Sequence, residues 1–201
     1  MTDETFDRNS WERRWAQALR ESPEKLANRL PNAHLLAEVR DLRPGLALDA
    51  GCGHWSEAIW LATSGWRVTA VDFSATALDY GRSTAHAVGA DVAERIEWME
   101  GDLGSWTHHP FDLVSCLYVH VAGSVVEMVS RLGTGVALGG TLLLVGHRPT
   151  DPVSMRLSAR SASASSRRHS PVWPSIRSRM RSAWPLCRAY SRPAWPGSNA
   201  R

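Results

Sequence analysis

Two acidic residues and two glycines stand where they could bind a ligand. Asp49 ends a short apolar run and is followed by Gly51 and Gly53. Glycine lets the backbone of a turn approach a ligand with no Cβ in the way, and a carboxylate beside that turn can meet a cationic group. Asp72 ends the next apolar run, 19 residues after Gly53, close to the spacing of roughly 20 residues expected for an acid that accepts ribose hydroxyls.

Two further residues extend this candidate site. Asp102 follows a third apolar run, which predicts a third acid at the same edge of a sheet. His120, in Tyr118-Val119-His120 after a fourth run, is the one candidate there for a general base. The sequence leaves open that His120 is a helix-start or surface histidine and that Tyr118 is a packed aromatic. The pair His108-His109 lacks partner ligands, so we expect no metal site.

The elements that must position these residues alternate along the chain. Short apolar runs predict strands at 46–48, 66–71, 95–99, 111–117 and 141–145, and stripes at helical spacing predict helices around 59–61, 75–88 and 125–132. Two amphipathic helices precede them, over 11–19, capped by Asn9 or Ser10, and over 35–42. Strands that alternate with helices predict an α/β fold, a Rossmann-like, mostly parallel sheet of about five strands with helices on both faces. Ligands bind such sheets beyond the carboxyl ends of the strands.

Composition narrows the class of protein. The chain has 201 residues, 43% of them hydrophobic, which suits one folded domain. No apolar run approaches the roughly 20 residues of a membrane span, and the polar first residues do not read as a secretory signal. Three widely spaced cysteines fit neither a disulfide framework nor a zinc site. We therefore expect a cytoplasmic protein that spans no membrane and whose folded part has no membrane partner.

Charge divides the chain into unlike parts. Residues 1–153 hold 13 basic and 20 acidic side chains, whereas residues 154–201 hold ten arginines, twelve serines and no acid. We predict N-terminal helices over 1–44 that cap the acceptor side, a ligand-binding domain over 45–153, and a separate segment over 154–201. Three interpretations of that segment stay open: an out-of-frame translation, a disordered basic arm that binds nucleic acid or anionic membrane, and an extension with a structural role.

The ordered motifs resemble those of class I S-adenosylmethionine-dependent methyltransferases. They are Leu48-Asp49-Ala50-Gly51-Cys52-Gly53, Val68-Thr69-Ala70-Val71-Asp72-Phe73-Ser74, Gly101-Asp102-Leu103, Phe111-Asp112-Leu113-Val114 and Gly139-Gly140-Thr141-Leu142. The opening Trp11-Glu12-Arg13-Arg14-Trp15 is similar to that of bacterial small-molecule methyltransferases of the thiopurine and tellurite-resistance type. The family's last strands, which follow the fifth, have no counterpart after residue 153.

The resemblance implies a role for each site residue. The methionine end of S-adenosylmethionine would lie by Asp49, Gly51 and Gly53, the ribose by Asp72, the adenine by Phe73, Asp102 and Leu103, and the sulfonium and acceptor by residues from Leu117 to His120. The implied activity is methyl transfer to a small molecule by direct displacement.

One residue departs from the family pattern, and more than one function stays open. Trp55 stands where the family usually has a third glycine, so either it turns away from the ligand or affinity suffers. A nicotinamide-binding Rossmann protein would need a glycine at Ser56. The sequence is also compatible with a non-catalytic cofactor-binding relic and with a nucleic-acid binder that acts through residues 154–201.

Overall fold

The computed structural model describes residues 7–103, 110–121 and 123–147. The pair His108-His109 and the basic segment 154–201 lie outside these ranges. Within them, the structure holds one five-stranded sheet and seven helices.

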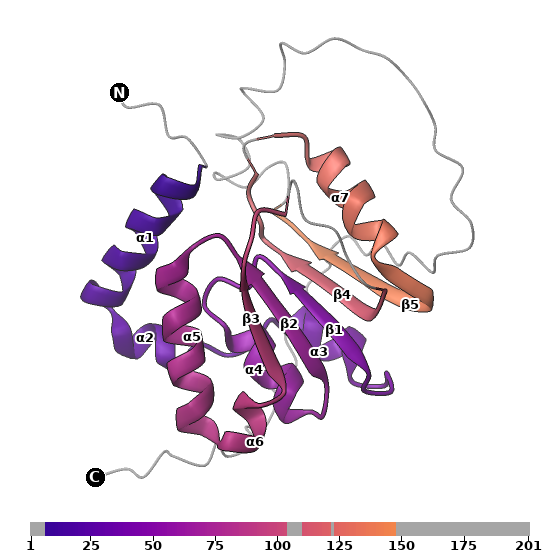
Figure 1. Ribbon diagram of the computed structural model, residues 1–201, viewed down its shortest axis with the longest axis horizontal. Helices are drawn as coiled ribbons and strands as arrows, with labels where there is room; N and C mark the ends of the chain where they lie inside the picture. The colour runs from indigo at the N-terminus through magenta and orange to yellow at the C-terminus, as the bar shows by residue number, and fades with distance from the viewer. Residues whose placement is uncertain (1–6, 104–109, 122, 148–201) are drawn as a thin grey trace.

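All strand pairs of the sheet are parallel. The strands are β1 (Leu46–Ala50), β2 (Arg67–Asp72), β3 (Ile96–Glu100), β4 (Phe111–Leu117) and β5 (Val136–Val145). Their order is β3-β2-β1-β4-β5, visible in Figure 1. The chain therefore winds outward from β1 in both directions, and the strand order reverses beside β1. The predicted Rossmann-like α/β class is confirmed.

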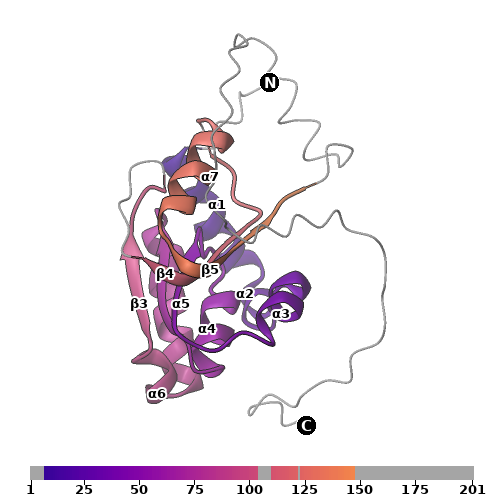
Figure 2. The same ribbon diagram turned by 90° about the vertical axis from the view of Figure 1, so that its right-hand side faces the viewer.

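Helices cover both faces of this sheet. They are α1 (Arg8–Glu21), α2 (Pro23–Ala27), α3 (Ala33–Val39), α4 (Ser56–Thr63), α5 (Ala75–Val88), α6 (Ala90–Ala93) and α7 (Val125–Thr134). Because side chains alternate along a strand, Ala47 packs with α3 and α4 in one apolar cluster, whereas Leu48 packs with α7 in a second. Figure 2 shows α7 and α4 on opposite sides of the sheet.

The N-terminal boundaries differ from two expectations. Helix α1 is capped by Asp7, whose Oδ1 accepts the Ser10 backbone N–H at 2.8 Å, so the predicted cap at Asn9 or Ser10 is wrong. A carboxylate that accepts from the third residue inside the helix satisfies one of its unpaired N–H groups. Helix α3 ends at Val39, and Leu42 lies in the turn that follows, donating to the Val39 carbonyl at 3.0 Å.

Strand β5 also differs from the prediction. It begins at Val136 rather than at Thr141, and Gly139 and Gly140 lie inside it instead of forming a turn before it. The register between β4 and β5 shifts there, from Phe111 opposite Val136 to Leu113 opposite Thr141. Gly139 has φ +80°, a conformation that favours glycine. A bulge of this kind interrupts the alternation that marks a strand in sequence.

No helix in the described ranges has the length and apolar content that a membrane crossing requires. Strand β5 pairs only with β4 within those ranges.

Candidate functional site

A cavity of about 300 Å³ lies at the carboxyl ends of the strands. It opens beside β1, where the strand order reverses, which is the position at which sheets of this type bind ligands. The structure brings all the candidate site residues together around it: Asp49, Gly51, Gly53, Asp72, Phe73, Asp102, Leu103, Leu117 and His120.

Asp49 is the most deeply buried acid of this cavity. It lies near the end of β1, is 3% exposed, and accepts a hydrogen bond from the Ser115 hydroxyl at 3.0 Å through Oδ1. Its Oδ2 is buried and has no hydrogen-bond partner among the described residues. Burial, together with the nearby carboxylates of Glu57 and Asp72, raises the pKa of Asp49 to about 8. An unpartnered buried acceptor is costly, and a cationic donor would relieve that cost.

The turn after β1 has no room for a side chain at either of its two glycines, Gly51 and Gly53. The Gly51 and Cys52 amides donate to the Val71 carbonyl at 2.8 and 3.0 Å, which ties the turn to β2. Gly51 has φ +74°, and a Cβ there would collide with Val119. Gly53 has φ +42°, and a Cβ would come within 2.8 Å of the Trp15 ring. Both positions therefore require glycine.

Asp72 is held in place by the backbone around it. Its Oδ2 accepts the Gly53 N–H at 3.0 Å and its Oδ1 accepts the Ser74 N–H at 2.9 Å. Burial raises the pKa of Asp72, and these backbone donors oppose the rise. A carboxylate has about four acceptor positions, so each oxygen retains capacity toward a ligand. Asp72 thus joins the glycine turn to the start of α5.

The remaining predicted residues line the cavity from β2, β3 and β4. Phe73 follows β2 and is half-buried, and Leu117 ends β4. Asp102 and Leu103 follow β3, and Leu103 packs into the apolar cluster beneath the cavity. An apolar side chain and a carboxylate therefore stand side by side at that wall.

Trp55 turns away from the cavity. Its side chain is 2% exposed and lies in the core, with its ring 4.7 Å from that of Tyr80 and 6.3 Å from that of Trp15. The residue is the N-cap of α4 and has φ +58°. This left-handed conformation accounts for the glycine that the family favours there, while the buried ring leaves the turn open.

The sequence predicts that N-terminal helices cap the acceptor side, but it does not identify the residues of α1 that line the cavity. Trp11 and Trp15, four residues apart on α1, both line the cavity. The Trp11 ring stacks on His120 at a centroid distance of 6.0 Å, and His120 stacks on His147 at 5.5 Å. In the sequence, the two tryptophans form an ordinary apolar stripe, and nothing distinguishes a stripe that faces a core from one that faces a cavity.

Burial and the charges of His147 and Arg14 lower the pKa of His120. Its imidazole is therefore neutral at pH 7 and able to accept a proton. This is the protonation state that a general base requires.

Glu57 is a second cavity residue that sequence reasoning missed. It lies in the first turn of α4, is 7% exposed, and accepts from the Asn32 N–H and the Ser56 hydroxyl, both at 3.0 Å. Burial raises its pKa, but His54, with Nδ1 at 3.5 Å, together with hydrogen bonds from the backbone and from Ser56, outweighs burial and keeps the pKa of Glu57 below its ordinary value. An acid in the first turn of a helix is common for capping reasons alone, so the sequence carried no signal of this role.

In the described ranges, no group of three or more His, Cys, Asp or Glu side chains could hold a metal ion.

Comparisons with known proteins match the part of the chain that contains most of the sheet. Residues 47–140 match the model of a family described as a methyltransferase domain. A curated protein from Methylorubrum populi (strain ATCC BAA-705 / NCIMB 13946 / BJ001), named protein-L-isoaspartate O-methyltransferase, is 33% identical over 129 residues, which are 63% of this chain and 57% of that protein. The chain thus spans little more than half the length of this relative.

Solved structures share the fold. The SAM-dependent methyltransferase from Thiobacillus denitrificans, in complex with S-adenosyl-L-homocysteine, is 23% identical with a TM-score of 0.53, over 64% of this chain and 54% of that one. The SAM-dependent methyltransferase from Geobacter sulfurreducens, in the same kind of complex, is 22% identical with a TM-score of 0.53, over 64% and 53% of the two chains. At this level of identity the likeness concerns the fold.

Proposed function

Residues 47–140 form a methyltransferase domain of the class I, Rossmann-like type, and from that premise we propose that this chain transfers a methyl group from S-adenosylmethionine to a small-molecule acceptor. The observation that carries the proposal is one cavity lined by every residue that the family resemblance singles out. Its most buried acid, Asp49, keeps an oxygen without a partner among the described residues.

The methionine end of the cofactor fits beside β1. Oδ2 of Asp49 would accept a hydrogen bond from the ammonium group of the cofactor, because that oxygen is buried and an ammonium group donates up to three hydrogen bonds. Gly51 and Gly53 would lie along the methionine chain. A Cβ at Gly51 would collide with Val119, and a Cβ at Gly53 would collide with Trp15. Charge and shape at this end therefore both suit a cationic, slender group.

The nucleoside end fits the next two strands. Asp72 would accept the two ribose hydroxyls, since each of its oxygens already faces a fixed backbone donor and has acceptor capacity left. Phe73 and Leu103 would pack against the faces of the adenine, and Asp102 would accept from its amino group. These roles follow the order of the strands from β1 to β3.

When bound, S-adenosylmethionine supplies an electrophilic methyl group on a sulfonium, so the protein mainly has to align a nucleophile and exclude water. Leu117 and His120 line the cavity beyond β4, and Trp11 covers it from α1. His120, neutral at pH 7, would take the proton of an acceptor that arrives protonated.

The wall that α1 forms bears on the size of the acceptor. The cavity is enclosed on one side by Trp11 and Trp15 of α1, which favours a small molecule. The Methylorubrum populi relative is named for an isoaspartate acceptor in proteins. An acceptor screen should therefore include an isoaspartyl peptide beside aromatic and thiol-containing small molecules.

We also propose a reducing, cytoplasmic setting. Cys52 and Cys116 are both buried free thiols, as is usual for proteins in that compartment.

Calorimetric titration of S-adenosylhomocysteine into the full chain tests the cofactor assignment. We expect a dissociation constant on the order of micromolar, lost in Asp72→Ala and retained in Asp79→Ala. Asp79 is a matched control because it lies on the exposed side of α5, where its carboxylate pairs with Arg82 at 2.6 Å. NADH serves as the negative ligand. Equal affinity of the two variants, or tighter binding of NADH, would contradict the proposal.

A further inference from the structure

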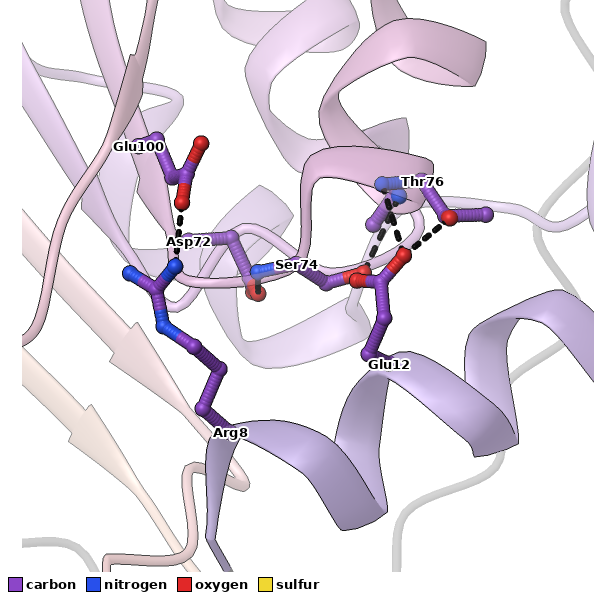
Figure 3. Close-up of polar contacts among 7 residues, drawn as sticks. Arg8, Glu12, Asp72, Ser74, Thr76 and Glu100 are labelled. Atoms are coloured by element: carbon purple, nitrogen blue, oxygen red, sulfur yellow. Dashed lines mark hydrogen bonds and ion pairs between the residues drawn. The ribbon is translucent and has the colours of Figure 1, made fainter.

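Glu12 of α1 joins this helix to the turn that follows β2. Its carboxylate accepts from the Thr76 hydroxyl and from the Thr76 backbone N–H, the latter at 3.3 Å. Burial raises the pKa of Glu12, but hydrogen bonds from Ser74 and Thr76 outweigh burial and hold the pKa below its ordinary value. The carboxylate is therefore ionised at neutral pH. Figure 3 shows it reaching from α1 into the start of α5.

The turn that Glu12 grips is the one that fixes Asp72. Asp72 accepts the Ser74 N–H at 2.9 Å, and the Ser74 hydroxyl caps α5 by accepting the Ala77 N–H at 3.2 Å. Glu12, Ser74 and Asp72 thus form one continuous set of contacts between α1 and the edge of the cavity. A charged acceptor at the first turn of α5 also complements the dipole of that helix.

The same helix supplies the aromatic wall of the cavity. Trp11 and Trp15 lie beside Glu12 on α1 and face the cavity, and Trp15 covers Gly53. Arg8, one turn before Glu12, pairs with Glu100 at the end of β3, although both partners are about half exposed and such pairs contribute little. Glu12, with two hydrogen bonds from Thr76, is therefore better placed than the exposed Arg8–Glu100 pair to hold α1 over the strand ends.

We propose that Glu12 is a positioning residue that couples the aromatic wall of α1 to the Asp72 turn, so that a ligand held by Asp72 also fixes Trp11 and Trp15 over the cavity. The inference rests on the proposed function only in taking a nucleoside as that ligand. It predicts that loss of one side chain distant from the cofactor weakens cofactor binding and loosens the acceptor wall together.

A double-mutant cycle on the full chain tests this coupling. Glu12→Ala is expected to weaken S-adenosylhomocysteine binding roughly tenfold and Thr76→Val severalfold. The double variant is expected to bind no more weakly than Glu12→Ala, because both changes remove the same interaction. Glu12→Gln keeps an acceptor oxygen for Thr76 and should recover part of the affinity. Glu21→Gln, on the same helix and bonded to Gln17, should bind like the unmodified chain.

Hydrogen exchange supplies a readout that a purely structural role would not move. In the unmodified chain, the ligand should slow exchange of amides in 73–80 and in 8–21 together. In Glu12→Ala the ligand should slow exchange only in 73–80. Additive effects in the cycle, an unchanged affinity of Glu12→Ala, or continued joint protection would overturn the inference. Should Glu12→Ala fail to fold, Glu12→Gln takes its place in both measurements.

Failure of the proposed function is distinguishable from failure of this inference. If the unmodified chain binds no S-adenosylhomocysteine, the cofactor assignment fails. Hydrogen exchange of the ligand-free chain then tests whether Glu12 couples α1 to the Asp72 turn. Faster exchange of 73–80 and 8–21 together in Glu12→Ala, compared with Glu21→Gln, would support it. Unchanged exchange of 73–80 would refute it.

Discussion

At the scale of single residues, the site depends on one carboxyl group in an unfavourable position. Asp49 is buried, near two other acids, with one oxygen lacking a partner among the described residues. Such an arrangement destabilises the ionised form in the folded chain. Between the pKa of an unfolded aspartate and about 8, the folded chain holds a proton that the unfolded chain has lost, so this group makes the chain less stable as pH rises through that window.

A cation beside Asp49 reverses that preference, which makes ligand binding pH-linked. Because an ammonium group favours the carboxylate, S-adenosylhomocysteine should release about one proton from Asp49 on binding between roughly pH 5 and 7. Calorimetry in phosphate and in imidazole measures this release, since the two buffers take up protons with different heats. Asp49→Asn should abolish the difference between buffers and weaken binding. Identical heats in both buffers for the unmodified chain would contradict the assignment.

His120 makes a second prediction at this scale. Its pKa is lowered by burial, with help from His147 and Arg14, from an ordinary value of 6.5. The neutral base therefore persists below pH 6.5 and is lost as pH falls through the lowered pKa. With a protonated acceptor, the rate should fall only on the acid side of that value. His120→Gln should slow transfer by roughly 10²-fold or more and remove that acid limb. A variant with the rate and pH profile of the unmodified chain would exclude His120 as the base.

At the scale of elements, periodicity is enough to locate most of the fold. The apolar runs of β2 and β4 and the stripes of α5 and α7 are strong signals, and the structure has these elements within one or two residues of the prediction. Strand β5 is longer than its apolar run indicates because the bulge at Gly139 breaks its alternation. The cap of α1 cannot be placed from sequence because aspartate, asparagine and serine at 7, 9 and 10 are all good caps, and local sequence does not choose among them.

Trp55 shows how an element can keep a family's conformation without the family's residue. Glycine is the usual residue there, yet Trp55→Gly should destabilise the chain. Loss of a large buried aromatic costs about 3–5 kcal/mol, whereas relief of the left-handed backbone returns only about 1–2 kcal/mol. We expect a net loss of about 2–3 kcal/mol in denaturant unfolding.

Trp55→Ala is the matched control for this change, because it leaves the same hole without the backbone relief. It should be less stable than Trp55→Gly by about 1 kcal/mol. A Trp55→Gly variant as stable as the unmodified chain would show that the buried ring contributes no more than the relief of the left-handed backbone returns.

At the scale of the whole molecule, the order of the motifs along the chain predicts which strand ends line the cavity. It does not predict which helix residues surround them. Asp49 and Asp72 lie at the carboxyl ends of β1 and β2, and Asp102 follows β3. Parallel strands bring their carboxyl ends to one edge, so the meeting of these residues follows from topology. Trp11 and Trp15 of α1 and Glu57 of α4 could not be assigned to the cavity this way. Their place depends on how helices pack across long stretches of chain, which periodicity does not encode.

The basic segment gives a prediction at the same scale. The described residues that line the cavity lie between Trp11 and Val121, so deletion of residues 154–201 should leave the dissociation constant for S-adenosylhomocysteine unchanged within about twofold. Calorimetry on both chains measures this. A large change would mean that the segment contributes to the site. The same pair of chains tests a role in nucleic-acid binding, which requires salt-dependent affinity for DNA or RNA that the deletion abolishes.

A crystal structure of the chain with S-adenosylhomocysteine at saturating concentration shows directly whether the cavity binds this ligand. We expect density for the ligand in the cavity, with its ammonium group at Asp49 Oδ2 and its ribose at Asp72. Trp55 should remain in the core. A ligand bound elsewhere on the molecule, or a cavity that stays empty at that concentration, would contradict the account.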